Sequence, residues 1–201
     1  MTIHSLPLGA YQTNTYILEN DGCCVIIDPG FAPETILTFL AQKDLTIDAI
    51  MLTHGHFDHV GAVEKILEVT GCSLWLSEKD WQQDADPASP SFYPLANHNL
   101  PNMHFYAEGD EISAAGMTFT VLETPGHTPG SVCLLTENAL FTGDTLFAGS
   151  CGRTDLPGGS WTTIQKSLRR LSTLDDALRV YPGHGDSTTL AAEKQYNPYM
   201  R

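Results

Sequence analysis

The chain has 201 residues, a length that suits one folded domain better than two, and we expect a single domain spanning residues 1–201. Hydrophobic residues make up 42% and charged residues 17%, which excludes a chain that is mainly disordered. The formal net charge of −14 repels phosphate backbones, so we expect no nucleic-acid partner.

The sequence also gives no sign of export or membrane insertion. No apolar run approaches the roughly 18 residues that a transmembrane helix needs, so we expect no membrane partner. The first residues contain neither a basic segment nor an apolar one of the signal-peptide type, which favours a cytoplasmic protein. Five cysteines without a Cys-x-x-Cys pair argue against a disulfide framework and against a zinc ribbon.

In the first half of the chain, short apolar runs alternate with helical patterns. The predicted elements, in order, are strands at 15–18 and 24–27, a helix at 33–42, a strand at 47–52, a helix at 60–69 and a strand at 74–76. A turn signal at residues 20–22 joins the first two strands into a hairpin.

The rest of the chain continues this alternation, with a polar stretch after its first helix. The predicted elements are a helix capped by Ser77, strands at 117–122, 132–135 and 139–142, a helix at 161–171, a strand at 178–181 and a helix at 188–196. Residues 85–102, rich in Pro, Ser and Asn, predict a loop or lid. Hairpins beside strand–helix–strand units predict an α/β fold in which two mixed sheets lie between layers of helices.

The strongest chemical signal is the segment 53–59, which places His54, His56, Asp58 and His59 between a strand and a helix. In an extended segment, residues i and i+2 point to the same side, so His54 and His56 can bind one ion. The chain then turns, and Asp58 and His59 can face a second position. Imidazole and carboxylate ligands suit zinc, iron or manganese.

Three more residues of the same chemistry follow at later strand ends, each beside a glycine. They are His127, Asp144 and His184. The small neighbours let the backbone approach a bound ion. Together with the segment 53–59, these residues predict a two-metal site at one edge of the sheets.

The motifs resemble those of the metallo-β-lactamase superfamily, whose signature His-x-His-x-Asp-His is matched at residues 54–59. The resemblance implies a four-layer αββα sandwich with the metals at one edge, between the sheets. It also implies that His54, His56 and His127 hold the first ion, that Asp58, His59 and His184 hold the second, and that Asp144 bridges them. We expect two divalent ions, zinc in the first place, with iron or manganese as alternatives.

Within that superfamily, the runs at residues 126–130, 143–147 and 151–155 resemble the glyoxalase II-like group. This implies a hydrolase that cleaves a small-molecule thioester, S-lactoylglutathione or a relative, by a metal-bridging hydroxide that Asp58 orients as a catalytic residue. True β-lactamases place a cysteine at the position of Asp144, so we expect no antibiotic hydrolysis. We also expect no C-terminal helical domain for glutathione, because the chain ends soon after His184.

Two residues outside the ligand set have predicted roles. Asp28, which follows the second predicted strand, is a candidate to hold a ligand histidine in its tautomer, and its alternative role is an Asp-Pro turn. Arg153, in a glycine-rich loop, is expected to meet a carboxylate of the substrate. Its alternative role is a structural pair with Asp155.

Other activities fit the same ligands. The second hypothesis is a mononuclear iron persulfide dioxygenase, whose relatives also carry a Gly-Arg-Thr-Asp run like that at residues 152–155. The run at 183–185, Gly-His-Gly, favours the two-metal hydrolase. A lactonase and a metal-bound protein without turnover are further alternatives, and the presence of all seven ligand side chains argues against the last of these.

Overall fold

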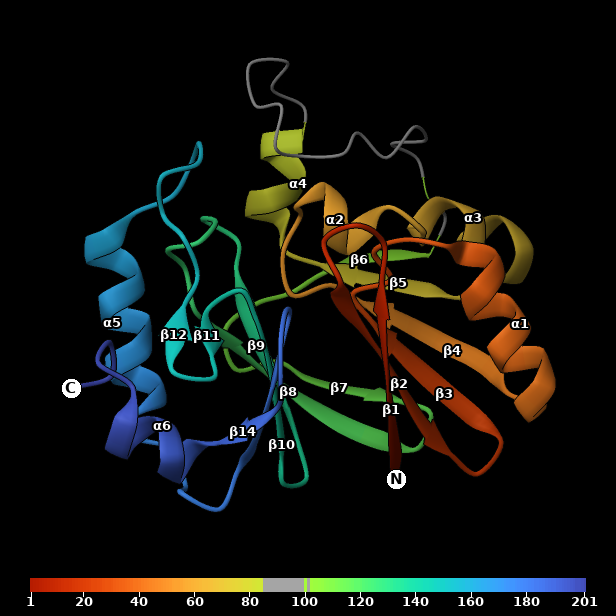
Figure 1. Cartoon of the computed structure of the whole chain (residues 1–201). Helices are drawn as coiled ribbons and strands as arrows, with labels where there is room; N and C mark the ends of the chain where they lie inside the picture. The colour runs from red at the N-terminus through yellow and green to blue at the C-terminus, as the bar shows by residue number, and fades with distance from the viewer. Residues whose placement is uncertain (85–99, 101) are drawn as a thin grey trace.

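Figure 1 shows the computed structural model of the chain, which describes residues 1–84, 100 and 102–201. Two six-stranded mixed sheets lie face to face in the middle of the molecule. Helices from the first part of the chain cover the outer face of one sheet, and helices from the last part cover the outer face of the other. The predicted four-layer αββα sandwich is therefore confirmed.

The first sheet contains the N-terminal strands in chain order. They are β1 (Thr2–Leu8), β2 (Thr13–Asn20), β3 (Cys23–Ile27), β4 (Thr46–Met51), β5 (Ser73–Leu76) and β6 (Met103–Phe105). The first three pair antiparallel, and the last three add in parallel. The helices on this side are α1 (Pro33–Lys43), α2 (Phe57–Val60), α3 (Val63–Thr70) and α4 (Glu78–Asp84).

The second sheet is built from the rest of the chain in the spatial order β14-β13-β10-β9-β8-β7. Its strands are β7 (Glu111–Ala114), β8 (Met117–Glu123), β9 (Val132–Thr136), β10 (Ala139–Gly143), β13 (Arg179–Pro182) and β14 (Thr188–Thr189). Only β10 and β13 pair in parallel within it. The outer helices are α5 (Trp161–Leu171) and α6 (Leu190–Tyr196), and a small ribbon joins β11 (Leu146–Phe147) to β12 (Ser150–Cys151).

The core follows from the alternation of side chains along each strand. In β2, Tyr16 and Leu18 point between the two sheets, whereas Ile17 points toward the helices on the outer face. Phe119 and Phe141 of the second sheet are fully buried in the same inner layer. Because both faces of the central strands are covered, these strands are apolar at consecutive positions, which is why the sequence predicts them as buried.

The structure differs from the predicted elements in several places. Six strands have no counterpart among the predicted elements: β1, β6, β7, β11, β12 and β14. The strand β1 lies at a sheet edge and has a mixed burial pattern, and the other five strands are two to four residues long. The helix predicted at 60–69 corresponds to α3, which starts three residues later, at Val63. The separate helix α2 ends at Val60, and the Ala62 amide between the two helices donates to the Pro29 carbonyl at 2.9 Å. The helix predicted at 188–196 starts later, at Leu190, after β14.

The predicted loop or lid at 85–102 lies outside the described residues except for residues 100 and 102. In the part of the chain that the structure describes, no helix is long and apolar enough to cross a membrane.

Candidate metal centre

The predicted ligands lie in four segments that follow the carboxyl ends of strands, and Asp58 and His59 belong to the short helix α2 in the first of these segments. The segment 53–59 follows β4, and the residues from the second sheet follow β8, β10 and β13. Backbone hydrogen bonds tie these loops across the gap between the two sheets: the Val132 amide donates to the Thr53 carbonyl at 2.8 Å, and the Asn14 amide donates to the Gly183 carbonyl at 2.7 Å. The strand ends of both sheets therefore meet at one place.

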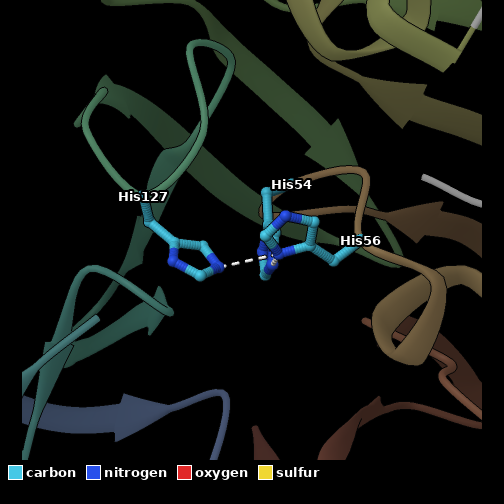
Figure 2. Close-up of side chains that lie close together, drawn as sticks. All are labelled: His54, His56 and His127. Carbon is cyan, nitrogen blue, oxygen red and sulfur yellow. Dashed lines mark hydrogen bonds between the residues drawn. The ribbon is translucent and has the colours of Figure 1, made fainter. Parts of the chain in front are cut away.

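His54, His56 and His127 form the first group. Figure 2 shows the three imidazoles facing one another, with His127 coming from the opposite sheet. His127 Nε2 lies 2.8 Å from His56 Nδ1, and His54 Nε2 lies 3.1 Å from the same atom. One ring nitrogen of each residue lies within 4.8 Å of the others, and all three side chains are buried. Such a set of three nitrogens can hold a metal ion.

Asp58, His59 and His184 form the second group, again with ligand atoms within 4.8 Å of one another. His184 Nε2 lies 3.3 Å from Asp58 Oδ2 and 3.4 Å from His59 Nε2. The surroundings fix two of these side chains, because Thr13 Oγ1 donates to Asp58 Oδ2 at 3.1 Å and His184 Nδ1 lies 3.1 Å from the Tyr11 carbonyl.

Asp144 lies between the two groups. Its Oδ2 is 3.4 Å from His127 Nε2 of the first group, and its Oδ1 is 3.4 Å from His59 Nε2 of the second. Oδ1 is buried and has no hydrogen-bond partner among the described residues. A methyl group at Gly183 would lie 2.3 Å from that oxygen, so glycine leaves the space in front of it open. A buried carboxylate oxygen without a donor fits a cation as its partner.

Asp28 supports the second group from behind. Its carboxylate accepts hydrogen bonds from the Thr53 amide at 2.8 Å and the Thr53 hydroxyl at 2.6 Å, and Oδ2 lies 2.9 Å from His59 Nδ1. With a proton on Nδ1, His59 presents the lone pair of Nε2 to the second group. Asp28 also falls within 4.8 Å of ring nitrogens of His54 and His59, but its oxygens are already engaged by these donors.

The electrostatics of the two groups differ. Burial and the neighbouring His59 hold the pKa of His54 well below its ordinary value, and burial beside His127 lowers the pKa of His56 to about 3. Burial also opposes protonation of His59, but the carboxylates of Asp144 and Asp28 outweigh it and raise the pKa of that imidazole well above its usual range. The imidazoles of His54 and His56 are therefore neutral and can accept a cation, whereas the raised pKa of His59 favours its protonated form in the metal-free protein.

One residue near the centre had no signal in the sequence. Asp80 of α4 is 2% exposed, and its carboxylate accepts hydrogen bonds from both loops that carry the first group. In the sequence it is one acidic residue in an ordinary polar helix, and only the tertiary contact distinguishes it.

A pocket opens over the centre beside the ligands. Its other lining residues include Tyr11, Phe57, Phe147, Cys151, Arg153 and Leu156. The Arg153 guanidinium makes two hydrogen bonds of 2.7 Å to the Asp155 carboxylate, and both side chains are exposed. Arg153 therefore forms the structural pair with Asp155, which the sequence offers as the alternative to binding a carboxylate of the substrate. The Arg153 carbonyl also lies 2.7 Å from His127 Nδ1, so this loop helps to orient a ligand histidine.

The αββα sandwich with two His/Asp groups at the meeting point of its sheets is the architecture of a metallo-hydrolase that uses divalent metal ions. The family model described as metallo-beta-lactamase superfamily matches residues 8–184, and the chain belongs to this superfamily.

Among curated relatives, the chain is 36% identical to the hydroxyacylglutathione hydrolase GloC of Haemophilus influenzae, over 100% of this chain and 98% of that protein. Among solved structures, it is 37% identical to BLEG-1, described as a B3 metallo-beta-lactamase, with a TM-score of 0.90 over 99% of each chain. A di-iron-bound form of TTHA1623 is 37% identical with a TM-score of 0.85, over 98% of this chain and 99% of that one. ETHE1 from Myxococcus xanthus is 32% identical with a TM-score of 0.82, over 98% of this chain and 84% of that one.

Proposed function

We propose that this protein hydrolyses a small-molecule thioester at a centre of two divalent metal ions. The observation that carries the proposal is the position of Asp144, whose two carboxylate oxygens face different ligand groups, one at 3.4 Å from His127 and the other at 3.4 Å from His59. A one-metal site would use a single oxygen of such a carboxylate, whereas two oxygens that face different ligand groups suit a carboxylate shared by two ions.

We assign His54, His56 and His127 to one ion, Asp58, His59 and His184 to the other, and Asp144 to both. When bound, such a pair of ions supplies an acidified water and a Lewis acid for a carbonyl oxygen. Asp58, whose Oδ2 accepts a hydrogen bond from the Thr13 hydroxyl at 3.1 Å, would orient the attacking water. A thiolate leaves with little help from a general acid, so the pocket needs no further acidic group.

The thioester substrate is supported by the similarity to GloC, described as a hydroxyacylglutathione hydrolase. We therefore propose S-lactoylglutathione or a relative as the substrate, with Arg153 at the pocket rim available to a substrate carboxylate once it leaves Asp155. Because BLEG-1 is described as a β-lactamase, the expectation of no antibiotic hydrolysis needs its own test, and a β-lactam belongs among the substrates tried.

The first experiment combines the metal content of anaerobically purified protein with turnover of S-lactoylglutathione. The proposal expects close to two divalent ions per chain and hydrolysis, with zinc, iron and manganese measured separately. Asp144→Ala should lose at least one ion and lower kcat/KM by more than about 100-fold, beyond the usual effect of outer residues on a metal site. Asp144→Asn keeps the volume and tests the charge alone.

Other outcomes point to other activities. One iron per chain, no hydrolysis and oxygen uptake with glutathione persulfide would replace the proposal by the persulfide dioxygenase. Two ions with turnover of a lactone or a β-lactam, but of no thioester, would keep the metallo-hydrolase and refute its proposed substrate.

A further inference from the structure

We infer that Asp80 is the positioning residue that holds together the two loops of the first metal group. Its Oδ2 accepts hydrogen bonds from the Gly55 amide at 2.9 Å and the Thr128 hydroxyl at 2.8 Å, and its Oδ1 accepts one from the Gly130 amide at 2.7 Å. The inference rests on the proposed assignment of one metal to His54, His56 and His127.

The hydrogen bonds that Asp80 accepts within the described part of the chain come from residues close in the sequence to the ligands of this group. Gly55 stands between His54 and His56, and Thr128 follows His127 directly. The imidazoles of His56 and His127 lie 2.8 Å apart in space and 71 residues apart in sequence. A buried group that bonds both segments at once fixes the spacing on which a common metal depends.

The chemistry of Asp80 also points to a dedicated role. Its side chain is 2% exposed, and none of the described lysines or arginines forms an ion pair with it. A carboxylate buried in this way loses its hydration, and this loss destabilises the fold unless hydrogen bonds or a cation compensate for it. Three donors on two loops provide that compensation, and the negative charge favours a cation held by the neighbouring histidines.

The neighbouring residues are shaped around this carboxylate. A methyl group at Gly130 would lie 2.4 Å from Asp80 Oδ1, so only glycine brings its amide this close. Thr128 is itself fixed by Ser131, whose hydroxyl lies 2.7 Å from the Thr128 hydroxyl. The second group has different supports, Asp28 behind His59 and Thr13 beside Asp58, which Asp80 does not contact.

This separation makes the inference testable with zinc binding alone, without a substrate. The substitution Asp80→Asn is combined with each of two other substitutions. His184→Ala weakens metal binding by the second group, and His127→Ala weakens metal binding by the first group. Zinc affinity is measured by competition with a chromophoric chelator. We expect Asp80→Asn to weaken zinc binding about 10- to 100-fold in the His184→Ala background and by less than about twofold in the His127→Ala background.

Two further variants complete the design. Glu78→Gln removes an exposed carboxylate from the same helix and should change neither background. Thr128→Val removes one of the three hydrogen bonds at nearly constant volume and should give a smaller loss with the same selectivity. If Asp80→Asn does not fold, Thr128→Val decides.

Equal losses in the two backgrounds, or no loss in the His184→Ala background, would overturn the role of Asp80. The readout is zinc affinity and involves no substrate. The role of Asp80 can therefore be tested even if the protein does not hydrolyse thioesters, and thioester hydrolysis can be tested even if Asp80 has no such role.

Discussion

Replacement of Asp28 by Asn changes the tautomer of a proposed ligand while leaving the backbone intact. Asp28 has a φ of 51°, in the left-handed region, which Asn tolerates almost as well as Asp. An oxygen of Asn can still accept from the Thr53 amide, but the NH2 group then faces His59 Nδ1. That contact requires an unprotonated Nδ1, which moves the proton to Nε2, the atom 3.4 Å from Asp144 Oδ1.

The size of the effect follows from these contacts. A metal cannot bind the protonated Nε2, so we expect the second ion to be held about 10- to 100-fold more weakly. In the metal-free protein, a hydrogen bond between two charged groups becomes one between two neutral groups, which costs about 1–1.5 kcal/mol. For a chain of this length, such a loss lowers the melting temperature by roughly 2–6 °C.

The pKa of His59 adds a pH dependence to this loss. Because its folded pKa is raised, with Asp28 as one cause, His59 stabilises the metal-free protein fully below its unfolded pKa of about 6.5. That stabilisation disappears as the pH rises through the folded value. The difference between wild type and Asp28→Asn should therefore be larger at pH 6 than at pH 9.

The assays are thermal unfolding of chelator-treated protein at the two pH values and zinc competition at pH 7.5. Asp28→Ala serves as the comparison, because it lacks the amide donor but adds the backbone cost of alanine at positive φ, about 1–2 kcal/mol. An Asp28→Asn variant that keeps the wild-type zinc affinity and melting temperature would refute the reasoning.

Three other predictions follow from the described contacts. Asp155→Asn should free Arg153 and lower KM for S-lactoylglutathione with little change in kcat; an unchanged KM would argue against a substrate role for the arginine. Phe119→Ala should cost about 3–5 kcal/mol in unfolding measurements, because the ring is fully buried between the sheets, while each folded molecule keeps its metal content. Zinc binding to metal-free protein should release more protons at pH 6.5 than at pH 9.5, because neighbouring carboxylates raise the pKa of His59 and His184; equal release at both values, read with an indicator dye, would contradict this.

The sequence predicts the parts of the fold that depend on local pattern. The buried strands β3, β4, β9 and β10 are continuous or nearly continuous apolar runs, with Asp48 interrupting β4. The helix α5 is predicted by the helical spacing of its apolar residues and by its cap, Ser160, which accepts from the Thr163 amide. β1 could not be predicted, because it is an edge strand with neither a continuous nor an alternating apolar pattern. The shortest strands owe their existence to the neighbour that they pair with.

The candidate site divides in the same way. The spacing of His54, His56, Asp58 and His59 is local and visible in the sequence, and each later ligand stands beside glycine at a strand end. The supports are not visible. Asp80 bonds a glycine 25 residues before it and a threonine 48 residues after it, so no local pattern distinguishes it from a solvent-exposed aspartate.

The placement of the centre couples metal binding to the packing of the two sheets. Each proposed ion takes ligands from both: the first from the loop after β4 and from His127, and the second from the same loop and from His184. Hydrogen bonds of the protein itself already join two of these loops to strands of the opposite sheet, because Val132 of β9 donates to Thr53 and Asn14 of β2 donates to Gly183. We therefore expect chelation to leave the sandwich folded but to lower its free energy of unfolding. The loss is about 2.7 kcal/mol for each site whose free metal concentration was 100 times the Kd of that site. A metal-free protein that unfolds entirely would mean that the ions, and not these backbone contacts, hold the sheets together.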